Sequence, residues 1–394
     1  MTNTSYSRIA RNARIGAGLN LTLVAALLLS VTPGPASAES KGRYEFEFTN
    51  VVDSTHGFTG FQSFPSINNK SAVTFVASRN GTGQGVFQMR DGELTTIAST
   101  LDGLVNFGNE APINASGVVA FTATTPTGSL AIFTGDGHTK KLIADSKVNG
   151  LLRLGVGAPA INAAGTVAFS SIRTDLGSPS SVFTGNGGPL TAVVTTSRTG
   201  FGSFGNVAIN DAGKIVFSAN LSNGVQGIFT APGTPVDIVD TNTHPEFGSF
   251  GDPVINNGGT IADAAFFFSS IGLEIITGNA KGITPRNDPA NPPFTDSEHP
   301  SLNNHGAVAF YAFPISGTSD PTGIFLEVSG GHSLIPVIKP GDSLFGSTVN
   351  SVDLGRFALN DRFELAFQYT LNDGRSGIAI ATFHGAKEGD DDQQ

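Results

Sequence analysis

A ten-residue pattern occurs seven times along this sequence and restricts the folds open to it. The pattern centres on one asparagine, as in PINASGVVAF at 112–121 and AINAAGTVAF at 160–169. Neighbouring copies lie 46 to 48 residues apart, except for the last two, which are 57 residues apart. Self-similarity at this period indicates a repeat architecture. The anchor asparagines are Asn68, Asn114, Asn162, Asn210, Asn256, Asn303 and Asn360.

Each repeat unit has the pattern of four β-strands. A short segment ends at the anchor asparagine, and V-A-F, G-I-F-T and a closing segment such as ELTTIAS at 93–99 follow it. Four strands in about 40–50 residues are typical of a β-propeller blade, whereas the coils of β-solenoids are shorter. We therefore predict an all-β fold, a seven-bladed β-propeller with four-stranded blades.

The two ends of the repeat region predict how the ring closes. The seventh unit ends near residue 383 without a fourth strand, whereas RYEFEFTNVV at 43–52 precedes the first unit and belongs to none. If this N-terminal strand completes the last blade, no sheet edge is left open. We place the propeller at 39–385 and a solvated acidic tail at 386–394.

The repeated residues have structural explanations. In N-x-x-G, asparagine and glycine take the first and fourth positions of a type I turn, and the asparagine side chain can bond the backbone two residues on. Phenylalanine recurs at two positions, such as Phe121 and Phe133, and predicts a layer packed between adjacent blades. In the fifth unit Asp263 replaces it, and AAFFF at 264–268 predicts a bulge that lets a nearby phenylalanine fill the site.

The N-terminus has the pattern of a secretory signal. Three arginines lie in the first 14 residues, an apolar run covers 21–31, and the small residues Ala36-Ser37-Ala38 follow. The run is shorter than the about 20 residues that cross a bilayer. We expect a signal at 1–38, cleavage after Ala38, and a secreted or periplasmic protein without a membrane span. An N-terminal membrane anchor is the alternative.

Composition excludes several classes of function. The formal net charge of −10 argues against nucleic acid and anionic membrane surfaces as partners. There is no cysteine, so disulfides, thiolate metal sites and a cysteine nucleophile are excluded. The sequence has no H-E-x-x-H spacing, G-x-S-x-G motif or phosphate loop. We assign no catalytic residue, no metal and no cofactor, and we expect a monomer.

The repeat units resemble two known kinds of repeat. The N-x-x-G turn followed by V-A-F is similar to the turn and second strand of Tol-type propeller repeats. The combination of I-N-x-x-G-x-V-A-F with G-I-F more closely resembles secreted bacterial repeat proteins of unassigned function, which are akin to HAF-type extracellular repeats. This resemblance covers nearly all of 39–394, and it implies a propeller fold and export without implying an activity.

One position differs in every unit although its neighbours repeat. It lies four residues before the anchor asparagine, where the inner strand begins and where propellers usually meet ligands around the central channel. Phe64 and Ala158 occupy it in two units. We predict the five polar residues at this position as ligand-binding residues of a channel mouth that takes a hydroxyl-rich or cationic ligand: Glu110, Asn206, Asp252, His299 and Arg356. The alternative is that they are ordinary solvated loop residues.

These observations favour a binding or interaction scaffold for an extracellular glycan or protein. Two alternatives stay open at this point, a polysaccharide lyase or hydrolase that uses the polar residues of the channel mouth, and a structural protein of matrix or envelope. Four tyrosines and no tryptophan count against a dedicated lectin or hydrolase, because such proteins commonly stack sugar rings on these side chains.

Overall fold

The computed structural model describes most of the chain after the predicted signal. The described residues are 44–62, 64–151, 153–154, 158–172, 180–268, 272–286, 294–314, 322–328 and 334–386. All of them belong to one compact unit, Gly42–Gln394. The signal predicted at 1–38, and the acidic tail apart from Ala386, lie outside the described residues. Among the described helices, none has the length and apolar character needed to cross a membrane.

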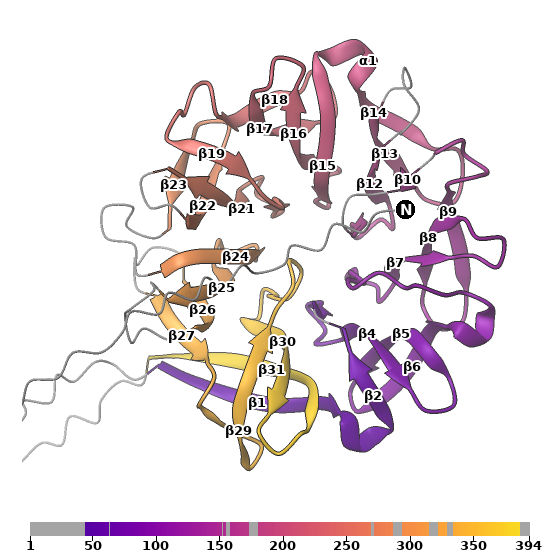
Figure 1. The fold of residues 1–394 in the computed structure, drawn as a ribbon, viewed down its shortest axis with the longest axis vertical. Coiled ribbons are helices and arrows are strands. Elements are labelled where there is room, and N and C mark those ends of the chain that lie inside the picture. Colours follow the sequence, from indigo (N-terminus) through magenta and orange to yellow (C-terminus); the bar gives the residue numbers. More distant parts are fainter. Residues whose placement is uncertain are drawn as a thin grey trace, which may run out of the picture. The chain divides into compact units, whose positions relative to one another are not determined.

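The described strands form seven antiparallel sheets set around a central axis as the blades of a propeller (Figure 1). Blade one has β2 (Phe58–Phe61), β3 (Ser66–Ile67), β4 (Val73–Arg79), β5 (Gly83–Arg90) and β6 (Glu93–Ser99). Blade two has β7 (Val119–Thr124), β8 (Leu130–Gly135) and β9 (Lys140–Asp145). Blade three has β10 (Arg153–Leu154), β11 (Ala160–Ile161), β12 (Val167–Ile172), β13 (Ser181–Gly185) and β14 (Thr191–Thr195). Blade four has β15 (Phe201–Ile209), β16 (Ile215–Leu221), β17 (Gln226–Ala231) and β18 (Val236–Asp240).

The remaining blades follow the same order. Blade five has β19 (Phe247–Phe250), β20 (Val254–Ile255), β21 (Ile261–Phe267), β22 (Gly272–Asn279) and β23 (Gly282–Pro285). Blade six has β24 (Phe294–Leu302), β25 (Val308–Pro314), β26 (Gly323–Glu327) and β27 (Leu334–Ile338). Blade seven has β28 (Ser343–Leu344), β29 (Ser347–Asp353), β30 (Glu364–Leu371) and β31 (Ser376–Ala386). Short helices η1 (Ser54–His56), η2 (Thr100–Asp102) and α1 (Thr196–Thr199) lie in connections.

The N-terminal strand completes the last blade, as predicted. Strand β1 (Tyr44–Asp53) pairs with β31 antiparallel, with Phe48 opposite Ala381 and Asp53 opposite Gly377. The chain then enters blade one through η1. The prediction of a seven-bladed propeller closed by the N-terminal strand is therefore confirmed.

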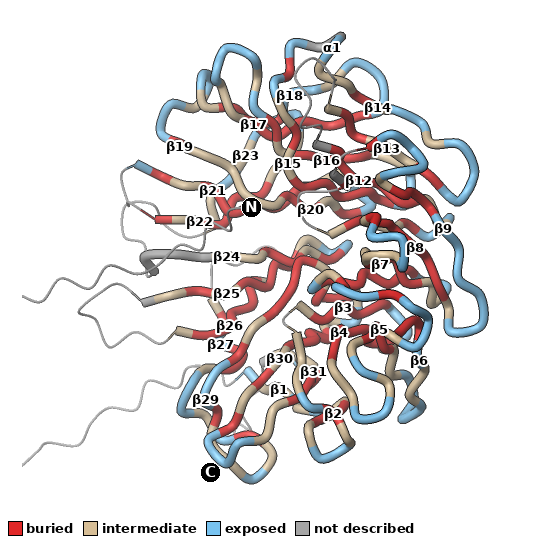
Figure 2. The backbone as a smooth tube through the Cα atoms, turned by 45° about the vertical axis from the view of Figure 1, so that its right-hand side comes forward, coloured by how far each residue is buried: buried red, intermediate tan, exposed pale blue. Residues whose placement is uncertain are grey.

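Stacked phenylalanine pairs fill the contacts between blades. Phe121 and Phe133 face each other across β7 and β8, with ring centroids 5.6 Å apart, and equivalent pairs occur in blades one, three, four and six. The pair of blade two packs against Val76 and Val86 of blade one, which confirms the predicted layer between blades. Buried residues run along the strands, and exposed residues concentrate in the outer turns (Figure 2).

The bulge predicted after Asp263 is wrong. Strands β21 and β22 pair without a register shift, and Asp263 lies opposite Ile276 at the position that a phenylalanine takes in the other units. Phe267 packs instead against Phe247, with ring centroids 4.3 Å apart. Asp263 therefore keeps the buried position itself and is 0% exposed.

The anchor asparagines hold the blades together as well as the turns. Within blade three, the Asn162 carbonyl accepts from the N–H of Gly165, and Asn162 Oδ1 accepts from the N–H of Thr166. In addition, each anchor Nδ2 donates to the backbone carbonyl of the next anchor at 2.9–3.3 Å, and Asn360 donates to Asn68, which closes the circle. The turn role is as predicted, and the ring of hydrogen bonds between blades is an additional finding.

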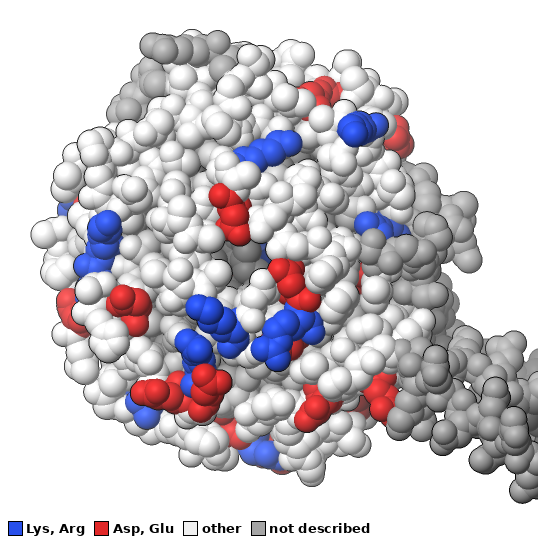
Figure 3. Space-filling model, turned by 180° about the vertical axis from the view of Figure 1, so that it is seen from behind, with Lys and Arg blue, Asp and Glu red and all other residues white. Residues whose placement is uncertain are grey.

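The two ends of the inner strands carry different surfaces. Six of the seven anchor asparagines, all except Asn162, line a cavity of about 190 Å³ at one end, together with Asp211 and Asp361. Seen from behind the view of Figure 1, the face of the unit is hollowed at its centre, and acidic and basic side chains lie around the hollow (Figure 3). The variable position of the repeat lies at the other end of the inner strands.

Candidate functional site at the channel mouth

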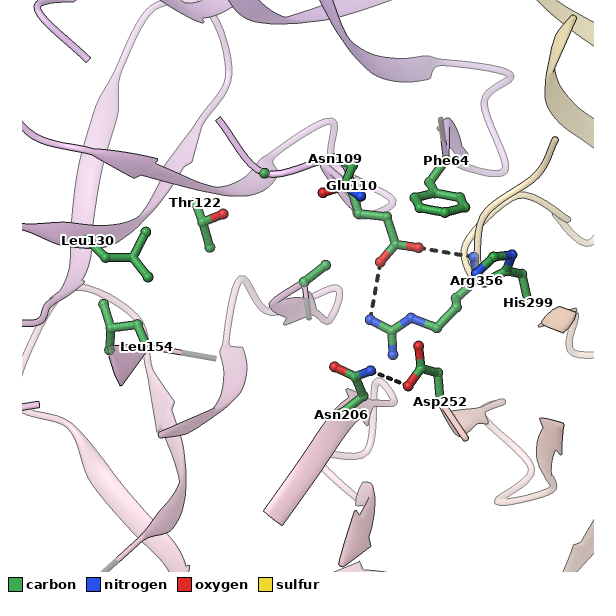
Figure 4. Close-up of a pocket in the computed structure, with 12 residues that line it drawn as sticks. Phe64, Asn109, Glu110, Thr122, Leu130, Leu154, Asn206, Asp252, His299 and Arg356 are labelled. Carbon is green, nitrogen blue, oxygen red and sulfur yellow. Dashed lines mark hydrogen bonds and ion pairs between the residues drawn. The ribbon is translucent and has the colours of Figure 1, made fainter. Parts of the chain in front are cut away.

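All seven residues at the variable position line one cavity of about 340 Å³. The close-up in Figure 4 shows the polar members of this set around the centre of the ring. Sequence reasoning therefore selected residues that the fold brings together from all seven blades. They are Phe64, Glu110, Ala158, Asn206, Asp252, His299 and Arg356.

An interruption of each innermost strand explains why these side chains leave the sheet. In blade five, Asp252 lies between β19 and β20, which pair separately with β21. In blade four, Asn206 lies within a register shift of β15 against β16. His299 lies within the corresponding shift of β24 and has a φ of 52°, in the left-handed region. Because the chain departs from regular pairing here, it can direct a side chain toward the axis.

Glu110 and Arg356 form a buried ion pair across the channel. Arg356 Nη2 donates to Glu110 Oε2 at 3.2 Å, and the backbone N–H of Arg356 donates to Glu110 Oε1 at 3.1 Å. Arg356 Nη1 also reaches the carbonyl of Val207 at 3.4 Å, so this side chain connects blades seven, two and four. The side chain of Arg356 is 3% exposed, and that of Glu110 is 9% exposed. Each therefore already has a partner, and together they form a wall of the cavity (Figure 4).

Asn206 and Asp252 form a second polar pair on the adjoining side. Asn206 Nδ2 donates to Asp252 Oδ1 between blades four and five (Figure 4). Asn206 is 9% exposed, and its Oδ1 is buried without a hydrogen-bond partner. A buried acceptor of this kind calls for an explanation such as a bound molecule, because nearly all buried polar atoms in proteins are paired.

His299 and Phe64 form the third part of the cavity. Their rings meet edge to face with centroids 4.6 Å apart. His299 Nδ1 is also buried without a hydrogen-bond partner. The phenyl ring, together with Leu130 and Leu154, gives the cavity apolar surface beside its polar groups.

Asp263 is buried next to this site, a placement that the sequence analysis did not predict. Its Oδ2 accepts from the N–H of Gly251 at 3.0 Å, while Oδ1 has no hydrogen-bond partner. Burial raises the pKa of Asp263 well above its ordinary value of 3.8; the charge of Asp252 adds to this and Arg356 opposes it. The only signal in the sequence was the loss of phenylalanine from one repeat unit. Asp263 is not among the residues that line the cavity.

A metal site does not emerge from the part of the chain that the structure describes. No group of three or more histidine, cysteine or acidic side chains lies in an arrangement that could hold an ion there.

Comparisons with known proteins identify the fold and a family. No curated protein matches the chain. An oligogalacturonate lyase from Vibrio parahaemolyticus is similar in structure, with 13% identity, a TM-score of 0.53, and coverage of 87% of this chain and 98% of the lyase. A prolyl endopeptidase has 9% identity and a TM-score of 0.53, with 82% of this chain and 47% of that chain covered. An acylaminoacyl peptidase from Pyrococcus horikoshii has 11% identity and a TM-score of 0.52, with 82% of this chain and 51% of that chain covered.

These likenesses show the propeller fold alone, because fold does not determine function at such low identity. The chain spans about half the length of the two peptidases. The resemblance to HAF-type repeats and the export of the chain stay predictions. The match to a family is more extensive, since it runs over residues 49–362. The chain therefore belongs to the protein family of unknown function DUF7453.

Proposed function

We propose that the chain is an exported binding protein that holds a sugar unit of a glycan at the channel mouth. The observation that carries this proposal is the convergence of seven unlike residues on one cavity, two of which, Asn206 and His299, each have a buried polar atom without a hydrogen-bond partner. Asn206 Oδ1 needs a donor, and His299 Nδ1 can accept or donate according to its tautomer. Sugar hydroxyl groups can do both.

The size and surface of the cavity fit a small polar ligand. Its volume of about 340 Å³ lies at the lower end of ligand pockets, which range from about 300 to 1,000 Å³. Phe64 beside the polar groups, and Leu130 and Leu154 away from them, supply apolar surface for the C–H groups of a sugar ring (Figure 4). A protein loop would need a larger contact area to bind stably.

The charges favour a neutral or cationic sugar over an acidic one. The cavity sets the carboxylates of Glu110 and Asp252 against one guanidinium, that of Arg356. Glu110 and Arg356 are already paired with each other, and the carboxylate of Asp252 accepts its hydrogen bond from the neutral amide of Asn206. An ammonium group beside Asp252 would gain a charge-assisted hydrogen bond, whereas a uronate would meet a like charge.

Binding is favoured over catalysis by the position of the acidic groups. Asp263 has the raised pKa that a general acid needs, but its carboxyl group is fully buried and outside the cavity lining. A general acid must come within hydrogen-bond reach of the group that it protonates. We therefore propose Asp252 as a ligand contact and assign no ligand contact to Asp263.

The test uses glucosamine trimer and galacturonate trimer as probes, with calorimetry for affinity and chromatography for new chain ends. We expect the glucosamine trimer to bind without cleavage and to bind more tightly than the galacturonate trimer. Asp252→Asn should weaken binding roughly tenfold or more, because a hydrogen bond to a charged group is lost.

Asp211→Asn is the matched control, since it removes the same charge at the other end of the inner strands. It should leave the affinity within about twofold. The proposal is overturned if neither sugar binds, if Asp252→Asn has no effect, or if cleaved ends appear.

A further inference from the structure

A second cavity adjoins the channel mouth in the seam between blades four and five. It has a volume of about 250 Å³ and shares Asn206 and Asp252 with the first cavity. The hydrogen-bonded pair of these two side chains therefore stands between the cavities. Both pockets open on the same pair of residues, so one elongated molecule can contact both.

Glycines and polar side chains shape this seam. Gly205 and Gly251 line it directly before Asn206 and Asp252 in the chain. A Cβ at Gly205 would lie 2.4 Å from Ser218 Oγ, and one at Gly251 would lie 3.0 Å from the carbonyl oxygen of Ala264. A side chain at either glycine would therefore press on the neighbouring strand of its own blade, β16 or β21.

The strands behind the glycines supply hydrogen-bonding groups. Ser218 and Asn220 from β16 and Gln226 from β17 line the cavity. Ser218 and Gln226 are half-buried, and Asn220 is exposed. These amide and hydroxyl groups differ in how far they are buried, so they can bind the hydroxyls of a sugar unit that lies partly in solvent.

The substitution at Asp263 occurs in this same seam. Where a blade has the phenylalanine pair, the pair packs toward the preceding blade, as Phe121 of blade two does against blade one. Asp263 holds that position in blade five, and it replaces a large ring by a smaller side chain that bonds the N–H of Gly251. The one repeat unit that has lost this ring is therefore the one whose seam carries the cavity next to the site.

We propose that the seam is a second sugar subsite, so that the ligand is a chain of at least two units running from the channel mouth outward between blades four and five. This inference rests on the proposed function, because the first unit occupies the channel mouth. Asn206 and Asp252 contact both units at the junction between them. The mouth sets the identity of the end unit, and the seam selects for chain length.

The experiment compares glucosamine with its β-1,4-linked dimer and trimer by calorimetry on the full chain. We expect the dimer to bind at least tenfold more tightly than the monomer and the trimer to add little. The double variant Asn220→Ala/Gln226→Leu should bring the dimer to the affinity of the monomer and leave monomer binding unchanged.

Gln84→Leu is the matched control, because Gln84 follows its anchor asparagine in blade one at the same distance as Gln226 follows Asn210. It should leave all three affinities unchanged. If the monomer binds through Asp252 but the dimer gains nothing, or if the double variant keeps the gain, the second subsite is refuted and the proposed function stands. If no sugar of the series binds, both are refuted.

Discussion

The buried pair of Glu110 and Arg356 allows a quantitative test of how the channel mouth is built. Replacing Arg356 by methionine keeps an unbranched side chain of similar length and removes the charge. Glu110 is then left as a buried carboxylate, since its side chain is only 9% exposed. Removing one partner of a buried ion pair costs about 3–5 kcal/mol, because the remaining charge has no compensation.

The contacts of Glu110 and Arg356 indicate where in this range of free-energy costs each single substitution should fall. The cost of Arg356→Met should lie in the upper part of this range, because the variant also loses the hydrogen bond from the guanidinium to the Val207 carbonyl. The cost of Glu110→Gln should lie near the lower limit of about 3 kcal/mol, because the carboxylate of Asp252 lines the same cavity as Arg356 and leaves a negative charge there. The double variant has neither buried charge and should cost less than about 2 kcal/mol, mainly for lost hydrogen bonds.

The assay is urea unfolding of the four proteins at pH 7, analysed as a double-mutant cycle. We expect a coupling free energy of about 3 kcal/mol or more between the two positions. Additive costs, or an Arg356→Met penalty below about 1 kcal/mol at pH 7, would refute the claim that the two charges depend on each other.

Three further expectations concern the core and the buried acids. Phe121→Ala should cost about 3–5 kcal/mol, because the ring is 1% exposed and stacks on Phe133; an unchanged melting temperature would contradict the layer between blades. Burial raises the pKa of Asp263 well above 3.8, so above that pH the folded protein holds a proton that the unfolded chain releases. Asp263→Asn should therefore leave the stability unchanged below about pH 4 and should stabilise the fold increasingly as the pH rises above it. Parallel melting curves of both proteins against pH would rule this out. Burial opposes the charge of Asp53, but hydrogen bonds, first that from the Thr55 side chain, outweigh it and lower the pKa of Asp53 to about 2. Asp53→Asn should therefore cost about 2 kcal/mol of stability at neutral pH, and this cost should disappear as the pH falls from 3.8 toward 2. Thermal melts from pH 2 to 7 measure this loss, and a pH-independent difference would contradict it.

Much of the fold could be predicted because each repeat unit of the sequence corresponds to one blade of the propeller. Seven copies of one turn give seven blades, and a strand left over at 43–52 has one place to pair once the last blade lacks a strand. The variable position could be recognised for the same reason, since a repeat makes its exceptions visible. Its seven residues meet because each innermost strand is interrupted at the same distance from its anchor asparagine.

The contacts that cross the ring were beyond the sequence pattern. That Arg356 reaches Glu110 depends on the width of the channel and on the direction of a long side chain, and neither is encoded in repeat spacing. The bond from one anchor asparagine to the next likewise joins residues 46 or more positions apart. Asp263 was misread because a missing phenylalanine suggests repair of the core, whereas the strand keeps its register and buries the carboxyl group.

The central claim, that ligand binds where the seven variable residues meet, is tested most directly by hydrogen exchange with and without the glucosamine trimer. We expect slower exchange in segments 107–110, 203–207, 250–252 and 354–357, which carry four of the seven residues of the channel mouth, two of them shared with the adjoining seam. The N-x-x-G turns at the other end of the inner strands should exchange at unchanged rates. Protection confined to those turns, or to the outer strands of the blades, would contradict the account.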